Sequence, residues 1–99
     1  MKDHIKKYLR QGEGDKLDYK QEITSTHKIA KTMVSFANHK GGTLLVGVRD
    51  NKTIAGIRTE DEKYMLEMAA AFYCKPEIPI ETIEHELGGK VILECIIPN

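Results

Sequence analysis

The chain has 99 residues, of which 40% are hydrophobic and 30% are charged, and its 15 basic and 15 acidic side chains give no net charge. This length and composition indicate one small globular domain that is neither disordered nor membrane-like. The longest apolar runs are far shorter than the ~18 residues of a membrane span, and the opening residues lack the pattern of a signal peptide. We therefore expect a cytoplasmic protein that does not enter a membrane.

The first part of the chain predicts a strand between two helices. Apolar side chains at helical spacing indicate a helix over residues 3–11, and glycines follow its end. Apolar and polar residues alternate over residues 17–20, as in a strand with one buried face. An amphipathic pattern then predicts a second helix to about Asn38, capped at its start by Ser25 or Thr26.

Two hairpins are predicted in the rest of the chain. Residues 43–48 are almost wholly apolar, which indicates a central strand covered on both faces. Residues 53–57 are expected to pair with that strand after a turn. Residues 80–86 and 90–97 flank a glycine pair and predict the second hairpin.

A third helix is predicted between the hairpins, from Thr59 to about Tyr73. Thr59 and Glu62 form a capping-box pattern, and an apolar stripe that includes Phe72 is expected to face the core. The order α-β-α-β-β-α-β-β predicts an α+β fold in which helices pack on a mainly antiparallel β-sheet. We expect a single domain over residues 1–99. Because the chain stops directly after an apolar strand, we also expect that the native protein continues and that the domain is truncated at its C-terminal end.

The cysteines and histidines show no spacing typical of a metal site. Cys74 and Cys95 are far apart and belong to no Cys-x-x-Cys motif, so we expect both to be small buried hydrophobic residues. The four histidines are scattered as well. The sequence therefore predicts no structural zinc and no cofactor.

Three acidic residues are candidates for chemistry. Glu13 and Asp18 flank the start of the first predicted strand, and Asp50 follows the run of residues 43–48. If these carboxylates meet, they offer the oxygen ligands that Mg²⁺ or Mn²⁺ prefers, and such an ion activates water for phosphodiester cleavage. The alternative is that all three are ordinary solvated acids.

Basic residues concentrate near the start of the chain. Residues 1–40 carry nine Lys or Arg against five Asp or Glu, whereas residues 41–99 carry six against ten. Cations that share one face would neutralise phosphates and give salt-dependent binding. The alternative is an ordinary charged helix face. The candidates for phosphate contacts are Lys20, Lys28, Lys31, Lys40 and Arg49.

Several linked sequence blocks resemble one known family. They are Gly12-Glu13 followed by Leu17-Asp18-Tyr19-Lys20, then Phe36-Ala37-Asn38, Gly41-Gly42-Thr43-Leu44-Leu45-Val46-Gly47-Val48 and Ile54-Ala55-Gly56-Ile57. Together they resemble the Schlafen, AlbA-like DNA-binding domain family, which is found in bacterial regulators and in the vertebrate Schlafen proteins. The resemblance covers about residues 12–57 by motif, and its layout extends to the end of the chain.

This resemblance implies contact with nucleic acid. In vertebrate Schlafens, three acids form a metal-dependent ribonuclease site that acts on transfer and ribosomal RNA, and Glu13 and Asp18 match the first two. The third family acid directly follows Gly-Val, where this chain has Arg49, with Asp50 one position later. One step along a strand turns a side chain to the other face, and Asp18 is one methylene shorter than the family's glutamate. The pattern therefore favours binding over cleavage.

We expect a DNA- or RNA-binding domain of a bacterial regulatory protein, such as a transcriptional regulator, that needs no cofactor. The first alternative is a metal-dependent endoribonuclease that uses Glu13, Asp18 and Asp50 with Mg²⁺ or Mn²⁺. The second alternative is a protein-interaction or homodimerisation domain of such a regulator, formed through an exposed strand edge.

Overall fold

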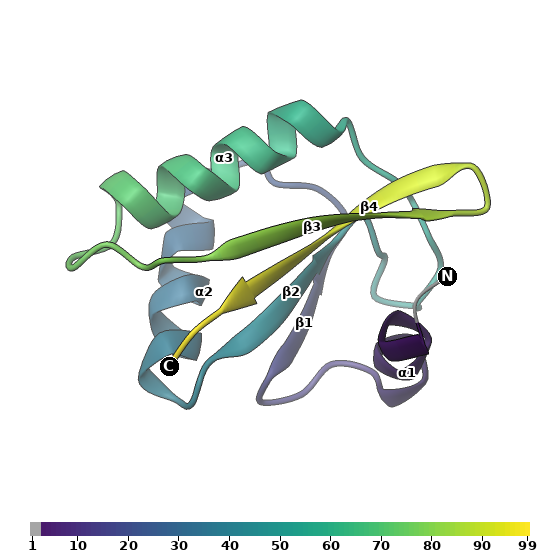
Figure 1. The fold of residues 1–99 in the computed structure, drawn as a ribbon, viewed down its shortest axis with the longest axis horizontal. Helices are drawn as coiled ribbons and strands as arrows, with labels where there is room; N and C mark the ends of the chain where they lie inside the picture. Colours follow the sequence, from purple (N-terminus) through teal and green to yellow (C-terminus); the bar gives the residue numbers. More distant parts are fainter. Residues whose placement is uncertain (1–2) are drawn as a thin grey trace.

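Helices pack on both faces of a four-stranded β-sheet in the computed structural model, which describes residues 3–99 (Figure 1). The elements are α1 (Asp3–Gln11), β1 (Leu17–Lys20), α2 (Thr26–Asn38), β2 (Gly42–Val46), α3 (Thr59–Phe72), β3 (Glu81–Leu87) and β4 (Lys90–Ile97). Helix α1 lies against one face of the sheet, and α2 and α3 cover the other. None of the described helices is long and apolar enough to span a bilayer. This architecture confirms the predicted α+β fold.

The sheet has the strand order β1-β2-β4-β3. Strand β1 runs parallel to β2, and α2 makes the crossover that a parallel pair requires. Strand β2 pairs antiparallel with β4, and β4 pairs antiparallel with β3 through a hairpin that turns at Gly88 and Gly89. The sheet is therefore mixed, with one parallel pair in a mainly antiparallel arrangement.

Alternating side chains of the central strand β2 enter two hydrophobic cores. Leu44 and Val46 pack with residues of α2 and α3, while Leu45 packs on the other face with Ile5 of α1. Both faces of β2 are buried, as its apolar sequence predicts. The chain leaves β2 beside the end of β1, because the Lys20 carbonyl accepts hydrogen bonds from the first two amides of the following loop.

The second arm of the first predicted hairpin is reduced to a single antiparallel bridge, between Val48 and Ile54. Gly47 follows β2 with a positive φ of 104°. Its carbonyl accepts hydrogen bonds from two successive loop amides, at 2.7 and 3.0 Å. Two donors on one carbonyl interrupt the one-to-one ladder that a strand pair needs, so residues 53–57 form a loop.

Helix α3 differs from the prediction in its cap and in its buried face. Arg58, one position before the predicted cap, is the N-cap and makes no side-chain cap bond, and the predicted capping box rests on the Thr59 side chain, which lies outside the described part of the structure. Glu62 is buried, at 4% exposure, and the buried stripe continues through Leu66 and Ala69. At 3.6 residues per turn, Phe72 lies roughly 90° from this stripe. Phe72 is 68% exposed, so the prediction that it faces the core is wrong.

Cys74 and Cys95 are free and buried, as predicted. Burial raises the pKa of Cys95 to about 12 and also raises the pKa of Cys74. Because the thiolate is the reactive form, we expect neither cysteine to react with Ellman's reagent at mildly alkaline pH in the folded protein. Both should react in denaturant. Rapid reaction of either thiol without denaturant would contradict these positions.

Candidate nucleic-acid interface

The turn after α1 and the start of β1 place Glu13 beside Asp18. Glu13 Oε2 accepts a hydrogen bond of 2.9 Å from the Tyr19 backbone N–H, which holds the carboxylate against β1. The Tyr19 hydroxyl in turn donates to the Tyr8 carbonyl of α1 at 2.7 Å. The position of Glu13 therefore depends on the packing of α1 against β1.

The three predicted acids come near one another in the structure. The pKa of Glu13 is raised above its ordinary value, mainly because its side chain shares a hydrogen bond with Asp18, while the Tyr19 N–H opposes the rise. Partial burial and the negative charges of Asp18 and Asp50 raise this pKa further. Asp50 thus lies near the pair, although it stands one position beyond the place that the family resemblance favours.

The raised pKa of Glu13 leads to a pH-dependent prediction. An acid whose pKa is raised by folding opposes folding when it is ionised, and this penalty disappears as the pH falls through the raised pKa. We expect Asp18→Asn to lower the Glu13 pKa toward 4.5 and to stabilise the protein at neutral pH, but not in acid below that value.

Carboxyl NMR titration and urea unfolding at the two pH values measure these effects. Asp15→Asn, an exposed change in the same turn, is the control and should leave the Glu13 pKa unchanged. If the Glu13 pKa is the same in wild type and Asp18→Asn, the proximity of the two carboxylates has no electrostatic effect and the account of this turn is wrong.

The three acids do not form a tight metal cage. Their carboxylate oxygens do not all lie within 4.8 Å of one another. The Lys20 ammonium lies 3.4 Å from Asp18 Oδ2 and already supplies part of the charge that a cation would provide. The residue types suit Mg²⁺ or Mn²⁺, but their spacing in this structure does not fit such an ion.

Lys20 and Lys28, two of the predicted phosphate contacts, line one hollow of about 170 Å³. Lys20 ends β1, and Lys28 lies in the first turn of α2. The Ser25 hydroxyl accepts a hydrogen bond of 3.2 Å from the Lys28 N–H, which confirms the predicted cap. The end of the strand and the start of the helix thus bring two lysines to the rim of the same hollow.

A second hollow lies at the other end of β1. It measures about 740 Å³ and is lined by Lys16, just before β1, and by Lys40, just after α2. Lys40 has a positive φ of 80°, which is uncommon for a lysine, in the turn that follows the helix. Lys31 lies beside a separate hollow. The structure therefore places Lys20 and Lys40 near opposite ends of β1, and it places Lys31 away from both.

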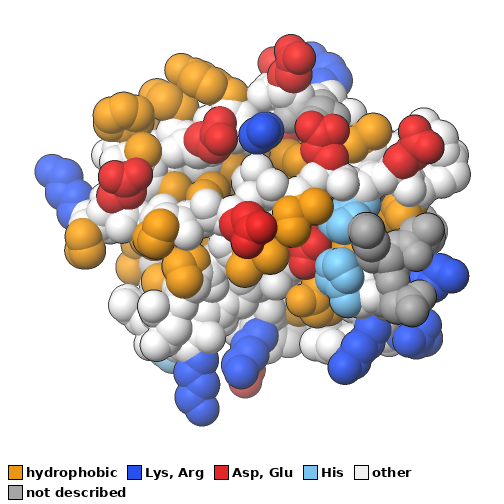
Figure 2. Space-filling view, viewed as in Figure 1, with side chains coloured by type: hydrophobic (Ala, Val, Ile, Leu, Met, Phe, Trp, Pro, Cys, Tyr) orange, Lys and Arg blue, Asp and Glu red, His pale blue; other side chains and the backbone are white. Residues whose placement is uncertain are grey.

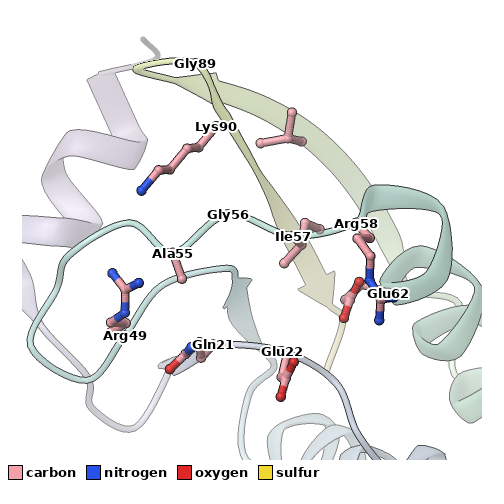
Figure 3. A pocket seen from close by; sticks show the side chains of 11 residues that line it. Gln21, Glu22, Arg49, Ala55, Gly56, Ile57, Arg58, Glu62, Gly89 and Lys90 are labelled. Atoms are coloured by element: carbon pink, nitrogen blue, oxygen red, sulfur yellow. The ribbon is translucent and has the colours of Figure 1, made fainter.

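Arg49 and Lys90 line a third hollow, of about 490 Å³ (Figure 3). The Arg49 guanidinium donates to the Thr53 hydroxyl at 3.2 Å and to the Ile54 carbonyl at 3.3 Å. Lys90 Nζ donates to the same carbonyl at 3.2 Å. Arg49 and Lys90 thus share one neutral acceptor, in a hollow that Arg58, Glu22 and Glu62 also line.

Charges are separated on the face of the molecule that Figure 2 shows. Acidic side chains lie mainly over α3 and β3, and basic side chains lie mainly along the opposite border, over α1, β1 and the end of α2. Glu22 lines both the hollow of Lys20 and the hollow of Arg49, so these two hollows are neighbours. The domain therefore has a basic surface along β1, the β1 border, formed by Lys16, Lys20, Lys28 and Lys40, although its net charge is zero.

Sequence reasoning does not find Lys16 and Lys90, which line two of the hollows. The Lys16 carbonyl accepts a hydrogen bond of 2.9 Å from Thr43 of β2, and Lys90 contacts the Ile54 carbonyl of the loop. Both contacts join segments that are distant in the sequence. The glycine turn before Lys90 marks a hairpin but does not indicate what its last residue contacts.

These features define an α+β domain with three acids and several lysines around its outer parallel strand. The family described as Schlafen, AlbA_2 matches residues 13–99, and the chain belongs to this family. Its fold is similar to that of the N-terminal domain of a RecG-related protein from Nitrosomonas europaea, solved by NMR. The TM-score is 0.59, with 18% sequence identity, and the match covers 92% of this chain and 68% of that chain. No curated protein sequence matches the chain significantly.

Proposed function

We propose that this domain binds the phosphate backbone of DNA or RNA along the outer edge of β1, as part of a bacterial regulatory protein. The proposal rests on the two lysine-lined hollows at the ends of β1, one with Lys20 and Lys28 and the other with Lys16 and Lys40. Strand β1 is an edge of the sheet, so no other described strand covers this border. Four steps of ~3.3 Å separate Lys16 from Lys20 by about 13 Å, roughly the axial length of four nucleotides.

The hollow of Arg49 and Lys90 extends this surface on the side of the loop after β2. Both cations share a single carbonyl acceptor, so a phosphate oxygen there gains two charge-assisted hydrogen bonds. The structural neighbour is named as related to a DNA helicase, which supports a nucleic-acid role for this domain. Lys31 belongs to a different side of α2 and is expected to contribute less.

Lysine acetylation with and without nucleic acid tests which surface is covered. Bound phosphates shield the ammonium groups that contact them, so labelling of those lysines should fall at low salt. Lys63 of α3 and Lys75 after it are the controls and should be labelled equally in both samples. If every lysine is labelled to the same extent with and without bound nucleic acid, the interface lies on another surface of the domain. The lysines expected to be protected are Lys16, Lys20, Lys28 and Lys40.

A metal-dependent nuclease is the second candidate, because Glu13, Asp18 and Asp50 lie near one another, although they must move closer together than in this structure to bind an ion. If the domain is such a nuclease, it should degrade RNA only when Mn²⁺ or Mg²⁺ is present. The Glu13→Ala variant should not degrade RNA. Asp15→Ala, from the same turn, is the control and should leave the degradation unchanged. RNA that stays intact through a long incubation with Mn²⁺ removes this candidate.

Pairing through the other edge of the sheet is the third candidate. Strand β3 forms that edge and carries three exposed glutamates, Glu81, Glu84 and Glu86. Like charges oppose pairing with the same edge of a second copy, so this candidate is weaker than the first. Light scattering over a concentration series measures the oligomeric state, and a monomer throughout would remove a homodimer.

A further inference from the structure

His4, His85 and Glu94 meet on the face of the sheet that α1 covers, although the first and last are 90 positions apart. His4 Nε2 and His85 Nε2 each lie 2.9 Å from the same carboxylate oxygen, Glu94 Oε1. Among the side chains that the structure describes, no other group of three or more His, Cys, Asp or Glu places its ligand atoms all within 4.8 Å of one another. Figure 2 shows histidine side chains gathered on this face next to an acidic one.

Two of the three groups are fixed by the β3–β4 hairpin. Glu94 of β4 pairs with Ile83 of β3, and His85 lies two positions further along β3, so both side chains point to the same face. Diagonal neighbours of this kind are within reach of long side chains. His4 comes from the first turn of α1, so the cluster joins the helix to the sheet.

The Glu94 carboxylate is buried where an uncompensated charge is costly. Its side chain is 3% exposed and that of His85 is 5% exposed, whereas the His4 side chain is 48% exposed. A buried carboxylate is retained when a countercharge or several hydrogen bonds compensate it. Two imidazoles aim the same ring nitrogen at one oxygen, and a dication among these three atoms would compensate the carboxylate charge.

We propose that His4, His85 and Glu94 bind a divalent transition-metal ion of the Zn²⁺ type, which fastens α1 to the sheet. Two imidazoles and one carboxylate are a donor set that suits zinc and leaves a fourth position for water. Tetrahedral Zn²⁺ with bonds of ~2.0–2.1 Å needs about 3.3 Å between ligand atoms, so each nitrogen must move outward by about 0.4 Å from its present 2.9 Å. The exposed edge of His4 gives the ion a path from solvent.

Cobalt binding to the tag-free chain tests this proposal, because tetrahedral Co²⁺ has visible absorption bands that Zn²⁺ removes when it displaces the ion. We expect one equivalent of Co²⁺ to bind the chelator-treated protein and Zn²⁺ to raise its midpoint of thermal unfolding. His4→Gln and Glu94→Gln should each weaken Co²⁺ binding by at least about tenfold. His27→Gln, at an exposed histidine of α2, is the matched control and should bind as wild type does.

Glu94→Gln keeps the size and the acceptor oxygen of the side chain, and circular dichroism shows whether it folds. If Glu94→Gln does not fold, His4→Gln alone decides, since His4 lies at the half-exposed rim of the cluster. Absence of Co²⁺ binding by wild type would overturn the proposal, and so would equal binding by His4→Gln. Either result would show that the three side chains form only a hydrogen-bonded cluster. The outcome is independent of nucleic-acid binding, because the cluster shares no residue with the β1 border.

Discussion

Replacing Gly41 with alanine is expected to lower the free energy of unfolding by about 3 kcal/mol. Gly41 has a φ of 78°, in the left-handed region that disfavours any side chain, and its N–H closes α2 by donating to the Phe36 carbonyl at 2.7 Å. A Cβ atom there would lie 2.6 Å from the Ile97 carbonyl oxygen of β4. A backbone oxygen of a paired strand cannot move away by rotation as a flexible side chain can. The end of α2 and the sheet must therefore both shift.

Gly88→Ala is the matched control for this substitution. Gly88 also has a positive φ, of 58°, but a Cβ atom there would have nothing within 4 Å. The backbone penalty alone should cost about 1 kcal/mol, and the difference between the two variants measures the clash at Gly41. Urea unfolding gives both values. Equal losses in the two variants would contradict the close approach of α2 to β4.

The double variant Lys28→Gln/Lys40→Gln is expected to weaken binding to nucleic acid by on the order of tenfold or more at low salt. Each lysine lines one of the two hollows at the β1 border, so the variant removes one contact from each end of the proposed surface. Loss of two phosphate contacts should also reduce the slope of log affinity against log salt by about 1.8 for duplex DNA. Titrations at several salt concentrations measure both quantities.

Lys63→Gln/Lys75→Gln is the control, because it removes the same charge from α3 and the segment after it. This variant should keep the wild-type salt slope and nearly the wild-type affinity. If both double variants lose the same affinity, binding depends on net charge and not on the β1 border. Both variants change exposed or half-exposed side chains, so circular dichroism should show the wild-type fold.

Local sequence signals are sufficient to predict α1, α2 and the β3–β4 hairpin, because each is marked by its own periodicity, cap or glycine turn. The structure departs from prediction where contacts between residues that are distant in the sequence determine the local conformation. The buried face of α3 carries Glu62, Leu66 and Ala69, and Phe72 lies off this face and is exposed. The carbonyl of Gly47 takes two loop amides and ends the first hairpin after one bridge.

The acids of the candidate site can be predicted from the sequence, but many of their surroundings cannot. Glu13 and Asp18 are close in the chain, so the family motif is sufficient to identify them. Lys90 arrives from β4, and the contact of His4 with Glu94 spans 90 positions. Such contacts follow from the order and register of the strands, which no short pattern in this sequence specifies.

Fluorescence anisotropy with labelled duplex DNA, single-stranded DNA and structured RNA, each across a salt series, tests the proposed function most directly. We predict binding to at least one of the three that weakens steeply and linearly in log affinity against log salt, as phosphate contacts require. The rank of the three ligands would then identify the substrate class. Absence of binding to all three at low salt would contradict the proposal that the β1 border is a nucleic-acid interface.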